Sequence, residues 1–363
     1  MKKILLSLLA VTALASCSKM DVVYDESTEI GFKAVAGNIT KAPVDGTVFP
    51  EGLNLYIYAQ TTDKTDGSAN YINDGEFAHK KTTDSKKLWG GTPSPYYWPN
   101  VHKLNFAGYS KSGNVAEAIS GTKATVGYSF ADASGLTITN YIAGSATAEG
   151  ANDLMWFGNT AKTEDGENGY GKDTPYVPVN MYHTCSWITF LIKGDAGTSG
   201  TTITGMKITG IDNQADVICY NVKPAEGDII QWSNNETTDN TGKKTDECSI
   251  NITSNLTLGT TARNVETGLL SSNTGGNIVV IPQLPGSISI TYQGTNANVA
   301  PETVTASLSL DLDADGKQTE PSTAWLPGKH YIYTITIKAN EILVAPTPED
   351  WTDYTPNPNV TVE

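Results

Sequence analysis

The sequence predicts an all-β protein made of sandwiches with Greek-key connections, and three observations favour that class. Thr, Ser, Gly and Asn are abundant whereas leucine is sparse. No convincing 3.6-residue apolar periodicity follows the apolar N-terminal segment, so no amphipathic helix is expected. Short alternating or apolar runs bounded by turn residues recur along the rest of the chain, which is typical of strands in sandwiches.

Nine runs form the clearest predicted strands: residues 53–59, 103–109, 136–142, 187–192, 203–208, 277–281, 288–292, 306–312 and 330–337. Polar tracts between them hold too little apolar surface to order themselves around a core. One such tract, TEDGENGYGKDTP, is followed by a renewed strand pattern at Val177. We therefore expect an N-terminal domain over residues 42–174 and a C-terminal domain over residues 175–363.

The N-terminus has the parts of an export signal. Lys2 and Lys3 precede an apolar run over residues 4–15, which is too short to span a bilayer as a mature helix. The tetrapeptide LASC that follows resembles a bacterial lipobox, which implies cleavage between Ser16 and Cys17 and lipid on the Cys17 thiol. Residues 1–16 are then a lipoprotein signal peptide. An ordinary signal peptide cut nearby is the alternative.

The charge of the chain excludes some classes of partner. Loss of Lys2 and Lys3 with the signal takes the formal net charge from −15 to −17, and Arg263 is the single arginine of the sequence. An acidic protein of this kind is a poor partner for nucleic acid and for anionic membrane surfaces.

Cysteines and histidines suggest no catalytic or metal chemistry. Cys185, Cys219 and Cys248 remain after Cys17, and a Cys219–Cys248 disulfide is left open beside isolated buried thiols, which the odd number favours. The histidines are scattered and accompany no hydrolase, zinc-protease or phosphate-loop motif, so we expect no enzyme and no cofactor. His183 and Cys185 share a strand face, but no third and fourth zinc ligand is in view.

Two further patterns have a functional and a structural interpretation. DLDADG resembles the start of a calcium loop, but Ser322 stands at its twelfth position instead of Glu, so a hairpin turn is favoured. Tyr96, Tyr97 and Trp98, with Trp89 nearby, would stack on sugar rings if they were exposed. Such aromatic groups more often fill a core.

Six segments spread over nearly the whole chain carry a family resemblance: IGFKAVAGNITKAP, YYWPNVHKLNFAGYS, NDLMWFG, PVNMYHTCSWITFLIKG, IVVIPQ, and WLPGKHYIYTITI followed by APTPEDW. In this order they resemble the fimbrillin family of Bacteroidetes, the FimA-like and Mfa-like pilins that build type V pili. Cys185 and Trp187 depart from the small or aliphatic residues more common there. The resemblance implies two transthyretin-like Greek-key β-sandwich domains, export as a lipoprotein, display on the outer membrane and assembly into fimbriae.

The resemblance also implies maturation by a trypsin-like protease, usually after an arginine in the loop that follows the first strand. Lys41, followed by Ala42, stands at the matching place, so an arginine-strict protease does not suit this chain. Residues 17–41 would then be a propeptide with a removable first strand. In that strand Ile30, Phe32 and Ala34 share one face.

Loss of the first strand would leave a groove that a strand from a neighbouring subunit fills, and repetition of this contact gives a filament. In the family the donor is the C-terminal segment of another subunit. Here Val360 and Val362 alternate around Thr361, behind two prolines that keep the approach extended. Alternatively, residues 342–345 complete the second domain's own sheet and the last residues do not donate.

We therefore expect a structural or adhesive fimbrial subunit whose mechanism is interaction. Its partners would be other fimbrial subunits, a trypsin-like maturation protease, and the outer membrane through the lipid on Cys17 before trimming. A host protein or glycan as adhesive target is left open. The alternatives are a monomeric outer-membrane surface lipoprotein that binds glycans, and a non-cleaved tip or anchor fimbrial subunit.

Overall fold

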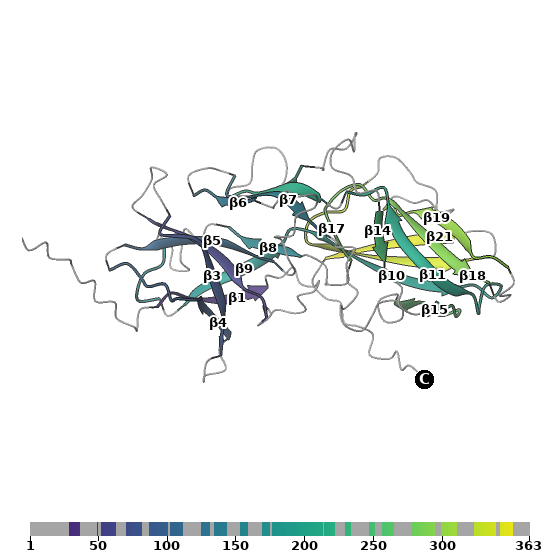
Figure 1. Ribbon diagram of the computed structural model, residues 1–363, viewed down its shortest axis with the longest axis horizontal. Coiled ribbons are helices and arrows are strands. Elements are labelled where there is room, and N and C mark those ends of the chain that lie inside the picture. The colour runs from purple at the N-terminus through teal and green to yellow at the C-terminus, as the bar shows by residue number, and fades with distance from the viewer. Residues whose placement is uncertain are drawn as a thin grey trace, which may run out of the picture.

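The computed structural model describes residues 29–36, 49, 52–62, 70–81, 87–100, 102–111, 125–130, 134–143, 153–158, 169–174, 176–212, 214–221, 229–233, 247–250, 256–264, 278–294, 299–310, 323–338 and 342–350. Within these ranges every regular element is a β-strand, which confirms the all-β prediction. The strands form two groups that lie one after the other along the longest axis (Figure 1). Nothing in the described part of the chain is a helix of the length and apolar character needed to cross a membrane.

The first group is built on a closed seven-stranded barrel with the order β1-β4-β3-β2-β5-β8-β9. Its strands are β1 (Gly31–Ala36), β2 (Leu55–Thr61), β3 (Ile72–Lys81), β4 (Lys87–Gly91), β5 (Leu104–Lys111), β8 (Leu154–Phe157) and β9 (Val177–His183). In β9 every second side chain is buried and those between are exposed, as the two-residue period of a strand requires. The buried set includes Val177, Val179 and Met181, which belong to the barrel core.

The second group consists of two sheets whose inner faces share one core. One sheet has the order β16-β10-β20-β21 with β17 also on β10, and the other has the order β14-β11-β18-β19 with β15 also on β11. The first sheet contains β10 (Ser186–Gly194), β16 (Arg263–Asn264), β17 (Ile278–Val280), β20 (Lys329–Ile337) and β21 (Ile342–Asp350). The second contains β11 (Thr202–Thr209), β14 (Glu247–Ile250), β15 (Leu256–Thr257), β18 (Ser287–Gln293) and β19 (Glu302–Ser307).

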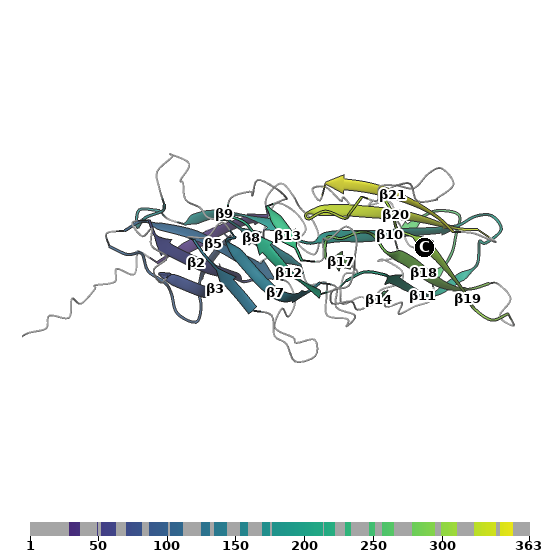
Figure 2. The same ribbon diagram turned by 90° about the horizontal axis from the view of Figure 1, so that it is seen from above.

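A fourth sheet, β13-β12-β7-β6, joins the two groups. It contains β6 (Thr125–Tyr128), β7 (Leu136–Ile142), β12 (Gln214–Cys219) and β13 (Ile230–Trp232), and it lies beside the barrel strands in both views (Figures 1 and 2). A third core lies under it, which we call the junction core. That core combines Tyr58 and Trp156 of the barrel, Val217 of this sheet, and Trp187 and Val279 of the second group. The two groups therefore share buried apolar surface rather than meeting only through a linker.

Strand pairing differs from the domain boundary expected near residue 174. β9 lies beyond that residue, yet it pairs in parallel with β1 and antiparallel with β8. β12 and β13 come later still, yet they extend the sheet of β7. The barrel ends at His183 and the first strand of the second group begins at Ser186. A polar tract shows where strands are interrupted, but it does not show which strands pair.

One predicted strand was largely misplaced. The prediction over residues 306–312 overlaps only the end of β19, which spans Glu302–Ser307. The side chains of β19 are exposed or half-buried, because it is an edge strand of its sheet. Apolar residues alternate from Val304 and Ala306 on to Leu308 and Leu310, beyond the end of β19, so the alternation does not mark where this strand ends. By contrast, the predicted range 136–142 matches β7.

Candidate functional site

The first described strand closes the barrel. β1 pairs antiparallel with β4 through Gly31 and Phe32 alone. It pairs in parallel with β9 through five positions, from Phe32 opposite Val177 to Ala36 opposite Met181. Among the described strands β1 alone joins β4 to β9, and its loss would open the barrel along its length.

The three side chains that the sequence assigns to one face of the first strand are in the barrel core. Ile30, Phe32 and Ala34 are buried, whereas Lys33 between them is exposed. The Phe32 ring makes edge-to-face contacts with Phe77 at 4.9 Å and with Phe106 at 5.2 Å between ring centroids. The Phe32 ring therefore contacts two further aromatic rings inside the barrel core.

Polar contacts hold the beginning of β1. The Ile30 amide donates to the Tyr96 carbonyl at 2.8 Å, and Glu29 forms an isolated bridge with Tyr97. Glu29 also makes an ion pair with Lys80 of β3. Because these two charged side chains are partly exposed, the pair contributes little to stability. The buried face of β1 therefore dominates its attachment.

The aromatic group near residue 97 does not form a sugar platform. Trp89 is 0 % exposed and Trp98 is 4 % exposed, and both belong to the barrel core. The Trp89 indole NH donates to the Leu53 carbonyl at 2.8 Å. Tyr96, which is half-buried, stacks on Phe77. The glycan interpretation of this group is wrong because its two indoles are inside the protein.

At the other end of the chain, residues 342–350 are already part of a sheet. β21 pairs antiparallel with the whole of β20, from Ile342 opposite Ile337 to Asp350 opposite Lys329. The alternative in which residues 342–345 complete the second domain's own sheet therefore matches the structure. Several other predicted positions lie outside the described residues: Ser16, Cys17, Lys41, Ala42, Asp311, Asp313, Asp315, Ser322, Val360 and Val362.

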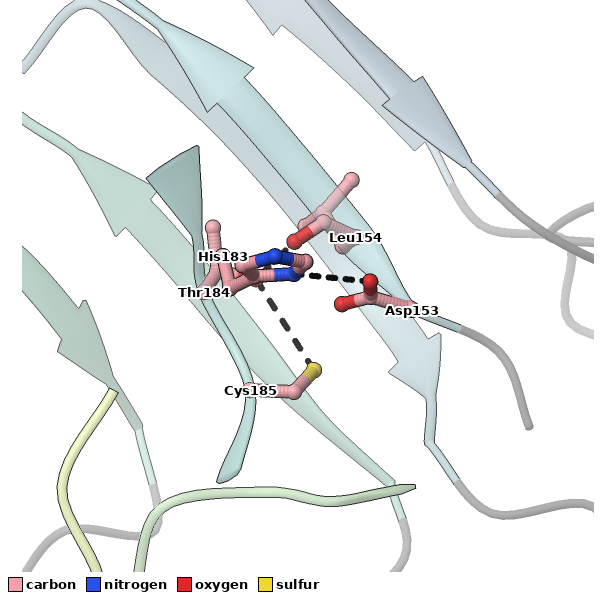
Figure 3. Close-up of polar contacts among 5 residues, drawn as sticks. All are labelled: Asp153, Leu154, His183, Thr184 and Cys185. Carbon is pink, nitrogen blue, oxygen red and sulfur yellow. Dashed lines mark hydrogen bonds and ion pairs between the residues drawn. The ribbon is translucent and has the colours of Figure 1, made fainter. Parts of the chain in front are cut away.

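A buried polar cluster lies where β9 ends, beside the junction core (Figure 3). His183 Nδ1 lies 2.8 Å from Asp153 Oδ2, and both side chains are fully buried. The amide and the hydroxyl of Thr184 both donate to the Leu154 carbonyl, at 2.9 and 3.0 Å. The Thr184 carbonyl accepts from the Trp232 indole at 2.8 Å. The sequence assigns Asp153 no role, because a lone Asp before a strand carries no distinguishing pattern.

The two described cysteine side chains are free thiols. Cys185 and Cys219 are both buried, so the structure contradicts a Cys219–Cys248 disulfide. Burial, aided by the nearby Asp153 carboxylate, raises the pKa of Cys185 to about 12. Burial also raises the pKa of Cys219. Both thiols stay protonated near neutral pH, so neither is a nucleophile or a ready metal ligand.

His183 and Cys185 do not begin a metal site in the described part of the chain. No group of three or more His, Cys, Asp or Glu side chains gathers there in a way that could hold a metal ion. His183 instead faces Asp153, and the Cys185 sulfur lies 3.8 Å from the Thr184 hydroxyl. The first contact joins the segments of β8 and β9, and the second joins consecutive residues.

Comparison with known proteins identifies a family over most of the chain. A family model described as fimbrillin-like matches residues 40–351. A search of curated proteins finds no match.

Three of the solved structures that resemble this chain come from Bacteroides vulgatus, Bacteroides uniformis and Porphyromonas gingivalis. A fimbrial protein from Bacteroides vulgatus is 16% identical, with 90% of this chain and 100% of that one covered at a TM-score of 0.51. A protein proposed to act in cell adhesion, from Bacteroides uniformis, is 19% identical, with 90% and 100% covered at a TM-score of 0.47. The tip fimbrial protein Mfa3 from Porphyromonas gingivalis, with a C-terminal truncation, is 9% identical, with 89% and 99% covered at 0.39. At these identities the first of the three supports a common fold and no more.

Proposed function

Because the chain belongs to the fimbrillin-like family, we propose that it is a structural or adhesive subunit of a type V fimbria that is exported as a lipoprotein precursor, trimmed, and polymerised by donor-strand exchange. Family membership supports a fimbrial subunit in a cell-surface appendage. The lipoprotein processing, the trimming and the strand exchange go beyond what family membership supports.

The position of β1 is the observation that supports trimming and strand exchange. One described strand near the N-terminus closes the barrel, and the side chains of Phe32 and Ala34 within it and of Ile30 just before it all enter the barrel core. Burial of Ile30 and Phe32 contributes about 2 kcal/mol each. Each backbone hydrogen bond to β9 adds roughly 1 kcal/mol. Removal of β1 would leave a groove that only another extended strand can fill with the same kind of contacts.

The donor in this proposal is the C-terminal tail of another copy. β21 is paired with β20 along its full length, so residues 342–350 cannot donate without breaking a sheet. The chain that follows residue 350 contains Val360 and Val362, whose spacing of two suits alternate pockets of a strand site. The contact joins unlike surfaces and does not close on itself, so repetition builds a filament.

The precursor in this proposal carries lipid on Cys17 and is cut between Lys41 and Ala42 by a trypsin-like protease. The cut lies between β1 and β2, so it would separate the strand from the rest of the barrel without breaking another described strand. The matching residue is a lysine, so the protease must accept lysine. Replacement of Lys41 by Gln should abolish trimming, and Lys41→Arg should preserve it or extend it to arginine-strict enzymes.

N-terminal sequencing of the surface-expressed protein tests the processing. A chain that starts at Ala42 supports the proposal, whereas a uniform start at lipidated Cys17 contradicts trimming. Deletion of residues 356–363 tests the donor. SDS-resistant ladders after protease treatment should disappear from this deletion variant, and unchanged ladders would exclude the tail as donor.

A non-cleaved tip or anchor fimbrial subunit is the second candidate. The lysine at position 41, where the resemblance leads us to expect arginine, favours it. In that case β1 stays in its groove and the lipid on Cys17 is kept. The same sequencing experiment separates the two candidates.

A further inference from the structure

We propose that Asp153, His183 and Thr184 form a register clamp that positions β9, and through β9 the strand that lies on its opposite edge. They act as positioning residues for strand binding in the barrel. The importance of the clamp for assembly rests on the proposed function, whereas its action on β9 does not.

The ladder between β8 and β9 is too short to define the register by itself. It consists of two residue pairs, Met155 opposite His183 and Trp156 opposite Tyr182. On the other edge, β9 is held by β1, which in turn reaches β4 through only two pairs. β9 is therefore paired with β8 through two residue pairs, whereas β1 is held on its far side by the two pairs with β4 and by the contacts of Glu29 and Ile30 with Tyr97 and Tyr96.

Three side-chain and main-chain contacts are added where β9 ends. The His183 imidazole faces the Asp153 carboxylate, and the Thr184 amide and hydroxyl both reach the Leu154 carbonyl (Figure 3). Asp153 and Leu154 belong to the β8 side, whereas His183 and Thr184 belong to the β9 side. Each contact therefore ties one strand to the other at a defined offset.

The clamp opposes a slip that the apolar pattern does not oppose. A slip of one residue would turn Val177, Val179 and Met181 outward and is already strongly unfavourable. A slip of two residues keeps every side chain on its own face, so the alternation of apolar and polar residues does not exclude it. That slip would separate His183 from Asp153, and both are fully buried. Separation of buried polar partners is costly, so the clamp makes the register unique.

The register of β9 also determines the geometry of the groove that β1 occupies. Phe32 lies opposite Val177 and Ala34 lies opposite Val179, while the Phe32 ring enters the pocket of Phe77 and Phe106. If β9 moved by two residues, the hydrogen-bonding edge would no longer match this pocket. When β1 has left, β8 is the only described strand that still pairs with β9. The clamp would then hold the empty groove ready for an incoming strand.

Cysteine cross-linking in the full-length chain reports a slip of β9 against β1, because β1 is held in place by the contacts of Phe32 with Phe77 and Phe106. Lys33 lies opposite Pro178, and a slip of two in either direction brings it opposite Asn180 or Tyr176. We would combine Lys33→Cys with Pro178→Cys to report the native register. Lys33→Cys with Asn180→Cys, or with Tyr176→Cys, reports the slipped ones. Each pair is oxidised with copper-phenanthroline and air, and the cross-linked fraction is quantified by mass spectrometry.

When the clamp residues are unchanged, the 33–178 cross-link should form and the slipped cross-links should be nearly absent. His183→Leu should raise the ratio of slipped to native cross-link by about tenfold or more, the change that a buried hydrogen bond to a charged group supports. His183→Asn should restore the native ratio, because its amide nitrogen can replace Nδ1. A folded His183→Leu protein with an unchanged ratio overturns the proposal.

A matched control separates register from stability. Gln283 is a buried amide that bonds to the backbone of Asp212 and Ile281 in the second group of strands. Gln283→Met should lower stability without any slipped cross-link. If His183→Leu does not fold, Thr184→Val, which keeps the side-chain shape and removes the hydroxyl bond to Leu154, decides the question. An unchanged ratio in Thr184→Val then overturns the proposal.

Failure of the clamp and failure of the proposed function give different results. The cross-links are formed in the untrimmed chain, so they do not require protease or polymer. SDS-resistant ladders are scored separately in the same variants. If His183→Leu gives slipped cross-links but no variant forms SDS-resistant ladders, the proposed function alone is contradicted. If His183→Leu gives native cross-links and normal ladders, the clamp alone is contradicted.

Discussion

Phe32 of β1 lies opposite Val177 of β9 in a parallel pair, although they come from opposite ends of the N-terminal half of the chain. The first strand of the barrel is therefore held mainly by its last strand. Parallel neighbours need a long connection, and here that connection is the rest of the barrel. A cut after Lys41 would release a strand whose partners all lie on the other side of the cut.

Truncation of Phe32 should destabilise the barrel strongly. Phe32→Ala leaves a cavity between Phe77 and Phe106, and we expect the free energy of unfolding to fall by about 3–5 kcal/mol. Urea unfolding followed by tryptophan fluorescence, with Trp89 in the same core, measures the change. Lys33→Ala on the exposed face is the control and should cost no more than about 1 kcal/mol. Equal losses in the two variants would contradict the buried role of Phe32.

The β11–β18 contact should not tolerate a side chain at residue 286. A Cβ on Gly286 would meet the backbone oxygen of Thr209 far inside contact distance and would also approach Ile211. Gly286→Ala should therefore lower the free energy of unfolding by about 1–3 kcal/mol. Gly127→Ala, which has open space around its Cβ, should change it by no more than roughly 0.5 kcal/mol. Thermal unfolding of the two variants compares them, and a harmless Gly286→Ala would refute the close approach.

Stability should fall in mild acid because of His330. This residue is 2 % exposed, stacks on Trp187 with 3.6 Å between ring centroids, and has its Nε2 2.9 Å from the Thr189 hydroxyl. Burial lowers the pKa of His330 from 6.5 to about 3. Between these values the unfolded chain binds the extra proton, so the free energy of unfolding should decrease by about 1.4 kcal/mol per pH unit as the pH falls. Above the unfolded pKa this contribution is constant.

Replacement of His330 by Phe isolates this effect. The variant keeps a ring beside Trp187 and cannot bind a proton, so its stability should vary less between pH 6.5 and pH 5, where most carboxylates are still ionised. Urea midpoints measured across this range for both proteins give the comparison. If the urea midpoints of the two proteins changed equally with pH, His330 would not be a group that binds its proton only in the unfolded chain.

The buried thiols should be protected in the native state. Cys185 and Cys219 are fully buried and their pKa values are raised, so iodoacetamide at pH 8 should leave both unmodified. In urea both should react at the rate of an ordinary free thiol. Peptide mass spectrometry distinguishes them from Cys248. Native-state alkylation of Cys219 at the unfolded rate would contradict its place in the junction core.

Local sequence patterns predicted those features of the fold that depend on residues close together in the chain. The face shared by Ile30, Phe32 and Ala34 follows from the two-residue period of a strand, and the structure buries all three. The strand over residues 136–142 was found for the same reason, because its runs of apolar side chains are visible without knowledge of its partners. β19 was misplaced because the apolar alternation that begins at Val304 continues past the end of the strand, so the pattern alone does not locate it.

What the sequence by itself determined is the all-β class and the side of each strong strand that faces a core, because both depend on alternation over a few residues. Only the tertiary structure decided that β9 completes the barrel beyond the expected boundary, that Trp89 and Trp98 are core residues, and that Asp153 meets His183. The physical reason is common to all three. Backbone hydrogen bonds between strands and the burial of a particular side chain depend on segments far away in the chain, and no short sequence pattern specifies which distant segment arrives.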